Sequence, residues 1–198
     1  MPVEGEEWVL QFTKRHKALR IAVLSCVMLA AFASPSAHAV ERTESVFLAG
    51  GKPQAGGGYF VDVRARLGPY IFGHFFIVYG RLNARGKIVK AQIVGFSLDS
   101  DRYWPALIIP VRGFVDWQKA DIKIVSNTVY RRYLTAAEFH QLDAKVRQIR
   151  AAKPAWHLLF NNCNHFVGEV AKSIGLHRPS SLMLPPTYIA RLHDLNDR

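Results

Sequence analysis

The chain has 198 residues, of which 49% are apolar, and 26 Lys and Arg against 15 Asp and Glu give a net charge of +11. This length suits one domain, and the apolar share excludes a disordered chain because it is sufficient to build a core. The sequence contains two cysteines, which excludes a disulfide-rich scaffold.

The first 39 residues have the pattern of a signal peptide. A basic segment, residues 14–20, precedes a short apolar run, residues 21–32. Ala37 and Ala39 then provide small residues at the two positions that signal peptidase reads, which predicts cleavage after Ala39. The apolar run is short for a membrane span, so a retained anchor is the weaker interpretation. We therefore expect a periplasmic or secreted protein.

Export changes the meaning of the charge and of the cysteines. Removal of four basic and three acidic residues leaves 22 against 12, so the mature chain keeps a charge of +10. Outside the cytoplasm this charge fits an anionic membrane, a cell-wall surface or an acidic substrate better than nucleic acid. An ordinary basic surface explains it equally well. Cys26 leaves with the signal peptide, and Cys163 then has no internal disulfide partner.

The mature chain begins with a glycine-rich stretch, residues 40–57, which is expected to form a flexible linker before a domain over residues 58–177. Alternating apolar and polar residues predict a half-buried strand over 59–66. A continuous apolar run predicts a central strand over 70–79, in which His74 shares a face with Phe76 and Val78.

Further elements follow in chain order. A hairpin turn at residues 83–86 predicts a strand over 87–96, and two more strands are expected over 106–114 and 121–130. Thr135 and Glu138 form a capping box that predicts a helix start, and this helix is expected to end before Pro154. Residues 178–198 are expected to form a proline-rich tail with a short helix from Thr187. The core stripe predicted for the helix consists of Phe139, Leu142, Val146 and Ile149.

The most informative stretch is residues 158–176. Cys163 lies at helical spacing from Val167, Val170 and Ile174, with Asn162 as the expected N-cap and Gly175 as the expected stop. Unpaired N–H groups at a helix N-terminus favour a thiolate, so Cys163 is a candidate nucleophile. The alternative is a small buried residue at a helix start.

A cysteine nucleophile needs a base. The mature chain has six histidines, and His74 is the one fixed in the middle of an apolar strand. A histidine in such a strand is more often a hydrogen-bonded core residue, so spacing alone leaves the pairing open.

Two motifs carry a resemblance to a known superfamily. Gly73-His74-Phe75-Phe76-Ile77-Val78-Tyr79, followed by Asn161-Asn162-Cys163-Asn164-His165-Phe166, resembles the circularly permuted papain-like superfamily of PPPDE-type peptidases and LRAT-like acyltransferases. The resemblance implies an α+β fold of the NlpC type, an antiparallel sheet packed against helices. It also implies Cys163 as the nucleophile, His74 as the general base and a thioester intermediate.

The chain departs from these families in two ways. Expected export argues against a ubiquitin-like substrate. LRAT-like members have a second histidine on the next strand. At that strand this chain has Gln92, which is a candidate third catalytic residue. The alternative interpretation is that Gln92 is an exposed strand residue without a catalytic role. The candidate substrate-binding residues are Tyr103 and Trp104 in a polar, aromatic loop, and Asn162 and Asn164 beside the cysteine. For the two asparagines the alternative is a structural role as cap and turn residues.

The leading interpretation is an exported cysteine peptidase or amidase that acts on a peptide or envelope-associated substrate without a metal or another cofactor. A lipid acyltransferase or thioesterase is the second. A non-catalytic binding module that keeps the fold is the third. A zinc site from Cys163, His165 and His157 ranks last, because their spacing matches no usual ligand set.

Overall fold

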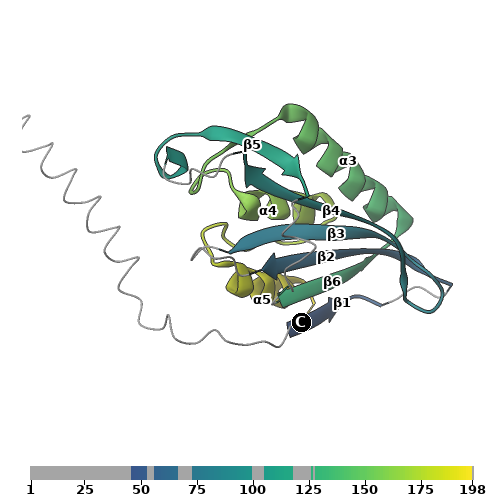
Figure 1. Ribbon diagram of the computed structural model, residues 1–198. Coiled ribbons are helices and arrows are strands. Elements are labelled where there is room, and N and C mark those ends of the chain that lie inside the picture. The colour runs from purple at the N-terminus through teal and green to yellow at the C-terminus, as the bar shows by residue number, and fades with distance from the viewer. Residues whose placement is uncertain are drawn as a thin grey trace, which may run out of the picture. The chain divides into compact units, whose positions relative to one another are not determined.

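The computed structural model describes residues 46–52, 56–66, 73–99, 105–117, 126 and 128–197. This part of the chain forms a seven-stranded sheet, in the order β1-β6-β2-β3-β4-β5-β7, and three α-helices (Figure 1). The predicted signal peptide, residues 1–39, lies outside it. The elements are β1 Val46–Gly50, β2 Gly58–Arg66, β3 His74–Leu82, β4 Ile88–Leu98, the short 3-10 helix η1 Pro105–Leu107, β5 Val111–Asp116, β6 Thr128–Leu134, α3 Ala136–Ala152, β7 Ala155–Trp156, α4 Cys163–Ser173 and α5 Pro185–Asn196.

The sheet is mixed, which corrects the expectation of an antiparallel sheet. β1 pairs with β6 in parallel, Val46 lying opposite Thr128, while the other strand pairs are antiparallel. This pairing also corrects the linker prediction, because residues 46–50 form a strand of the sheet. Strands that pair across some 80 residues leave no local turn signal, so the sequence pattern did not reveal the pair.

Local patterns did predict several elements. β2, β3 and β4 cover most of the strands expected from alternation and from the apolar run, and Asn83 accepts the N–H of Gly86 in the turn between β3 and β4. The Thr135–Glu138 capping box at the start of α3 is confirmed. The strand expected over 106–114 is instead the η1 turn followed by β5. The strand expected over 121–130 overlaps β6 only at residues 128–130, and residues 121–125 and 127 lie outside the described residues.

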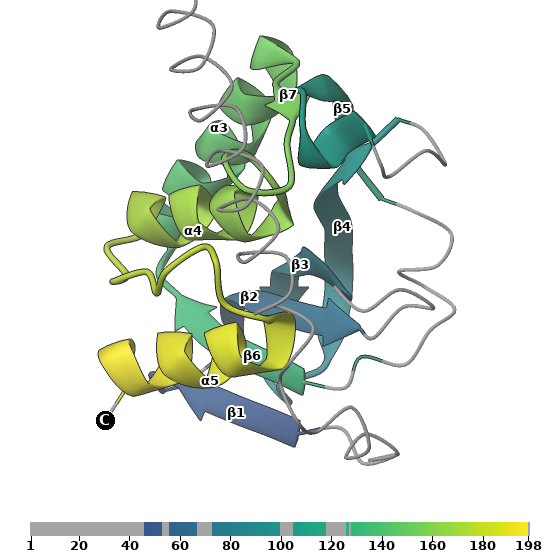
Figure 2. The same cartoon turned by 90° about the vertical axis from the view of Figure 1, so that its left-hand side faces the viewer.

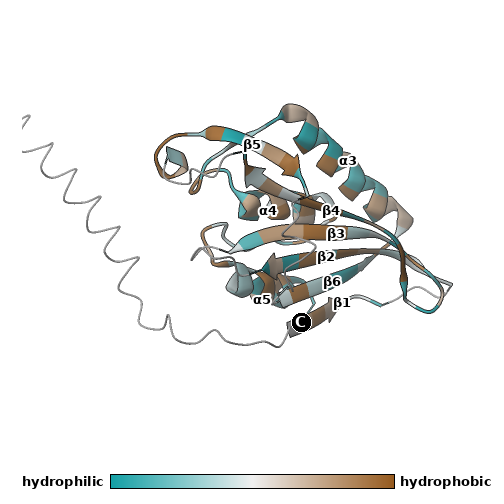
Figure 3. Ribbon diagram, in the orientation of Figure 1, coloured by the Kyte–Doolittle hydropathy of each residue, from teal (hydrophilic) through white to brown (hydrophobic). Residues whose placement is uncertain are grey.

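The helices α3, α4 and α5 lie along one side of the sheet (Figure 2). The side chains of alternate β3 residues, Phe75, Ile77 and Tyr79, point into the core on this side. Phe76 and Val78 point to the other face, where they form a smaller buried cluster with Phe60 and Leu82. Figure 3 shows how apolar residues dominate the central strands. None of the described helices has both the length and the hydropathy needed to cross a membrane.

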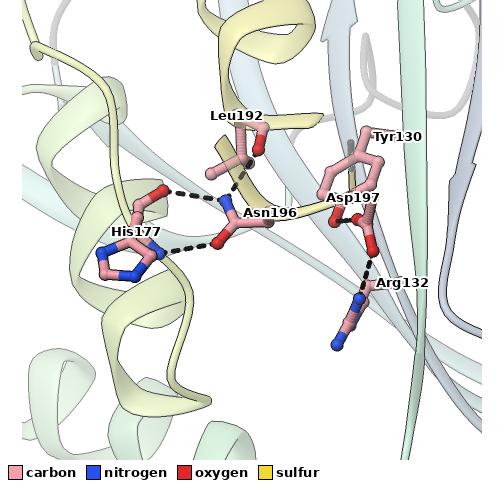
Figure 4. A network of polar contacts seen from close by, with 6 residues as sticks. All are labelled: Tyr130, Arg132, His177, Leu192, Asn196 and Asp197. Atoms are coloured by element: carbon pink, nitrogen blue, oxygen red, sulfur yellow. Dashed lines mark hydrogen bonds and ion pairs between the residues drawn. The ribbon is translucent and has the colours of Figure 1, made fainter. Parts of the chain in front are cut away.

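The C-terminal segment is part of the core, which corrects its prediction as a proline-rich tail. The short helix predicted from Thr187 is confirmed as α5. Tyr188, Ile189 and Leu192 of α5 are fully buried. The end of the segment is held by the polar network of Figure 4, in which the Asp197 carboxylate accepts from the Tyr130 hydroxyl and from the Arg132 guanidinium. Asn196 exchanges two hydrogen bonds with the backbone of His177, at 2.8 and 2.9 Å (Figure 4).

Candidate functional site

Cys163 is the first residue of α4, and the local sequence explains the helix start. Asn162 precedes it with an extended backbone, and its Oδ1 accepts the N–H groups of Asn164 (2.9 Å) and His165 (3.3 Å). The Asn162 Nδ2 donates to the Leu158 carbonyl and so also fixes the turn before the helix. The predicted capping role of Asn162 and the predicted stop near Gly175, which has φ +79°, are confirmed.

The Cys163 side chain is half-buried and packs against the core between the helices and the sheet. Its Sγ lies 3.7 Å from Asn164 Oδ1, to which the thiol donates. Burial raises the pKa of the Cys163 thiol above its ordinary value, and backbone hydrogen bonds from Phe75 and from the first turn of α4 oppose this rise. Because burial has the larger effect, the thiol is protonated at neutral pH, and its use as a nucleophile requires a base.

His74 is the first residue of β3 and follows Gly73, which has φ +60°. Its ring stacks on that of Phe76 with 6.1 Å between the centroids. On the neighbouring strand, a Cβ at Gly95 would lie 2.8 Å from His74 Nε2, so the absence of a side chain at Gly95 makes room for the imidazole. The His74 side chain thus lies on the same face of the sheet as Phe76, as the alternation in the sequence predicted.

The structure places Cys163 and His74 near the same end of β3 but on opposite sides of the sheet. The thiol lies beside the backbone of Phe75, the residue after His74. Cys163 packs on the helix side of the sheet, whereas the row of Phe76 faces the other side. Among the hydrogen bonds between described residues, none links Cys163 Sγ to the imidazole.

Arg66, the last residue of β2, is a site residue that the sequence analysis missed. It lies directly opposite His74 in the antiparallel register, so the two side chains share a face of the sheet. Arg66 is 7% exposed, and its positive charge lowers the pKa of Cys163. Its position at the end of an alternating strand was visible in the sequence, but its neighbour depends on strand register.

Gln92 does not belong to this site. It lies opposite Tyr79 on β4, is exposed, and receives a hydrogen bond of 3.3 Å from the Tyr79 hydroxyl. Tyr79 is five residues along β3 from His74, which corresponds to about 16 Å in a strand. The prediction that Gln92 orients His74 is therefore wrong.

The two asparagines beside the cysteine have structural roles. The buried Asn164 donates from Nδ2 to the carbonyls of Ser181 (2.8 Å) and Met183 (2.7 Å), and Asn162 is occupied by capping. These contacts fasten residues 181–183 to the first turn of α4. The cap and turn roles given as the alternative for both asparagines are confirmed, and their substrate-binding role stays a prediction. Tyr103 and Trp104 lie outside the described residues.

His165 strengthens the same attachment. Its Nδ1 lies 3.3 Å from the Asn162 backbone nitrogen and 3.0 Å from Asn162 Oδ1, and its Nε2 forms a hydrogen bond of 2.9 Å with the Ser181 hydroxyl. Burial and the nearby Arg178 lower the pKa of His165, so the ring is neutral at pH 7. His157 accepts the N–H of Leu159 and packs against the ring of Phe160. The residues described do not include a cluster of three or more His, Cys, Asp or Glu that could hold a metal ion.

Comparison with known proteins gives little further information. No family model matches the chain, and no curated protein matches it. A crystal structure of the type VI secretion system effector TseH is similar, with a TM-score of 0.47 and 14% sequence identity. The match covers 72% of this chain and 91% of that chain. A similarity of this size assigns neither a family nor a function, so the case for a function is made from the site.

Proposed function

We propose that this protein is a thiol hydrolase that cleaves an amide bond with Cys163 as the nucleophile and His74 as the general base. The observation that carries the proposal is the position of Cys163 in a capped first helical turn, with its Sγ beside the backbone N–H of Phe75 from a different element. A helix N-terminus and a facing N–H both favour negative charge on sulfur. The resemblance of the two motifs to permuted papain-like enzymes supports the same assignment.

The burial of the thiol defines the role of the base. His74 takes the proton from Sγ, the thiolate attacks the carbonyl carbon, and the carbonyl electron pair moves to oxygen. For this step the imidazole turns from its position on Phe76 toward Sγ. The intermediate then expels the amine, which takes the proton from the imidazolium, and a thioester remains. Water gives a proton to the imidazole and attacks the thioester, which releases the acid and restores the thiol.

Two groups are suited to stabilise the negative charges that arise. The Cys163 N–H occupies the first helical position, where no intrahelical acceptor exists, so it is the proposed oxyanion donor. The buried Arg66 supplies a positive charge beside His74 that favours the thiolate. The expected export and the net charge of +10 that the mature chain would keep support an anionic, envelope-associated peptide substrate.

The test is alkylation of Cys163 by iodoacetamide as a function of pH, followed by mass spectrometry of the Cys163 peptide because Cys26 also reacts. We expect His74→Ala to slow alkylation at pH 7 at least about tenfold, within the usual contribution of a general base. His140→Ala is the matched control, since His140 is exposed on α3. Equal alkylation rates in the parent chain, His74→Ala and His140→Ala would contradict the dyad and favour a binding module.

A second candidate function is acyl transfer or thioester hydrolysis on lipid. The observation that favours it is the set of exposed apolar side chains close to Cys163, which includes Leu159 (48% exposed) and Phe160 (75% exposed). Incubation with acyl-lipid and acyl-peptide donors, followed by mass spectrometry of Cys163, distinguishes the two functions. An acyl-enzyme formed from lipid donors alone would favour the second.

A further inference from the structure

Six exposed apolar side chains, here called the apolar rim, surround the start of α4. They occupy three segments: the loop after η1, the turn after β7 and the segment before α5. Their exposed fractions run from 48% at Leu159 to 80% at Ile108. The rim consists of Ile108, Ile109, Leu159, Phe160, Leu182 and Leu184.

Hydrogen bonds hold the three segments together. The Leu158 N–H donates to the carbonyl of Ala106 in η1 at 3.0 Å, which places the turn after β7 against the loop that carries Ile108. Two backbone hydrogen bonds between His157 and Asn161 close that turn, so Leu159 and Phe160 lie at its tip. On the other side of Cys163, Asn164 binds the carbonyls of Ser181 and Met183, which flank Leu182. The rim is therefore a fixed surface.

The figures place the rim at one end of the sheet. The loop after η1, the turn after β7 and the segment before α5 lie on the same side as the start of α4 (Figures 1 and 2). The hairpin between β3 and β4 lies at the opposite end of the sheet (Figure 3). That hairpin leads into Ile88 (43% exposed) and Val89 (60% exposed), two apolar residues far from Cys163.

We propose that the apolar rim inserts into an anionic lipid surface and holds the Cys163 site against it. Leu159 and Phe160 lie at the tip of a closed turn and are exposed, a shape that suits insertion between lipid headgroups more than the burial of a peptide. Contiguous exposed apolar surface is uncommon on a protein without a partner. The net charge of +11 supplies a long-range attraction to an anionic bilayer. The inference concerns docking and does not depend on amide cleavage.

The first experiment measures insertion directly, in the full chain with Cys163→Ser to remove thiol chemistry. Phe160→Trp and Val89→Trp each add one tryptophan, at the rim and at the opposite end of the sheet. Vesicles of phosphatidylglycerol and phosphatidylcholine carry bromine on the acyl chains. We expect bromine to quench the added fluorescence of Phe160→Trp and to leave that of Val89→Trp unchanged, after subtraction of the parent chain. Equal quenching, or none, would overturn the proposal.

The second experiment measures affinity by vesicle sedimentation. Leu159→Ser with Phe160→Ser should weaken binding to anionic vesicles at least about tenfold, because two apolar side chains no longer leave water. Ile88→Ser with Val89→Ser is the matched control and should bind like the parent. Equal loss in both variants would overturn the proposal. So would a parent chain that dimerises in solution through the rim, a result that would assign this surface to a second copy.

Each rim variant and its matched control keep residues 1–39, so any vesicle binding by that segment is common to the two proteins. Unchanged thermal unfolding of the two double variants establishes that the fold is intact. Alkylation of Cys163 is measured in the Leu159→Ser, Phe160→Ser chain with its cysteine retained. A normal rate there, together with weak vesicle binding, separates a failure of docking from a failure of the dyad.

Discussion

Arg66 and His74 lie opposite each other at the ends of β2 and β3, with their side chains on one face of the sheet. A buried cation in this position favours the deprotonated form of Cys163. The pairing therefore places a charge that acts on the proposed nucleophile beside the proposed base.

The first prediction concerns Arg66. Arg66→Gln should raise the pKa of Cys163 and move the midpoint of its alkylation profile to higher pH, because the favourable charge is removed. Arg66→Lys should restore most of the difference. The matched control is Arg64→Gln, since Arg64 lies two residues earlier on the same strand and pairs with Asp62 at 2.6 Å. An unshifted midpoint in Arg66→Gln would remove Arg66 from the site.

The second prediction concerns the cap of α4. Asn162→Ala should lower the free energy of unfolding by about 1–2 kcal/mol, because two backbone N–H groups lose their acceptor. Urea unfolding measures this loss. The variant should also raise the pKa of Cys163, since the first turn frays and the N–H groups near the thiol lose their alignment.

Thr135→Ala is the control for the cap, because it removes the corresponding side chain from α3. We expect a similar loss of stability there with no change in the alkylation of Cys163. If the two variants gave the same alkylation profile as the parent chain, the helix start would have no influence on the thiol.

The sequence predicted those elements whose signals are local. The alternation in β2, the capping box of α3 and the Asn162 cap of α4 each depend on residues within a few positions of one another. Alternation also predicted the row that His74 shares with Phe76. Which face the helices cover depends on packing between distant elements, so the separation of His74 from the helix side was not predictable.

The errors arose where distant residues determine the structure. β1 has five residues and is stabilised by β6, and Arg66 meets His74 through the register of two strands. Gln92 was assigned to the site because its position along β4 relative to β3 was unknown. The helix α5 did have a local signal, since Pro185 occupies its first position, where proline favours a helix start. The short helix predicted from Thr187 begins two residues later than α5 does.

The third prediction concerns the C-terminal network. Asp197→Ala should lower the free energy of unfolding by about 2–3 kcal/mol, because the Arg132 guanidinium and the buried Tyr130 hydroxyl both lose their acceptor. Glu169→Ala breaks an exposed pair with Arg178 and should cost less than about 1 kcal/mol. Gly50→Ala should act like Asp197→Ala, since a Cβ at Gly50 would displace the same carboxylate. Equal losses at Asp197 and Glu169 would show that the network adds no more than a surface ion pair.

The fourth prediction concerns pH and His165. Burial lowers the pKa of the folded-state imidazole below its ordinary value of 6.5, so the unfolded chain binds more protons near that pH. The contribution of His165 to stability is therefore complete above pH 6.5 and declines as the pH falls toward the folded-state pKa. Urea unfolding of the parent chain and of His165→Gln between pH 8 and pH 5 measures it. The difference in stability between the two proteins should shrink as the pH falls, and a difference that stayed constant would show that the imidazole titrates alike in both states.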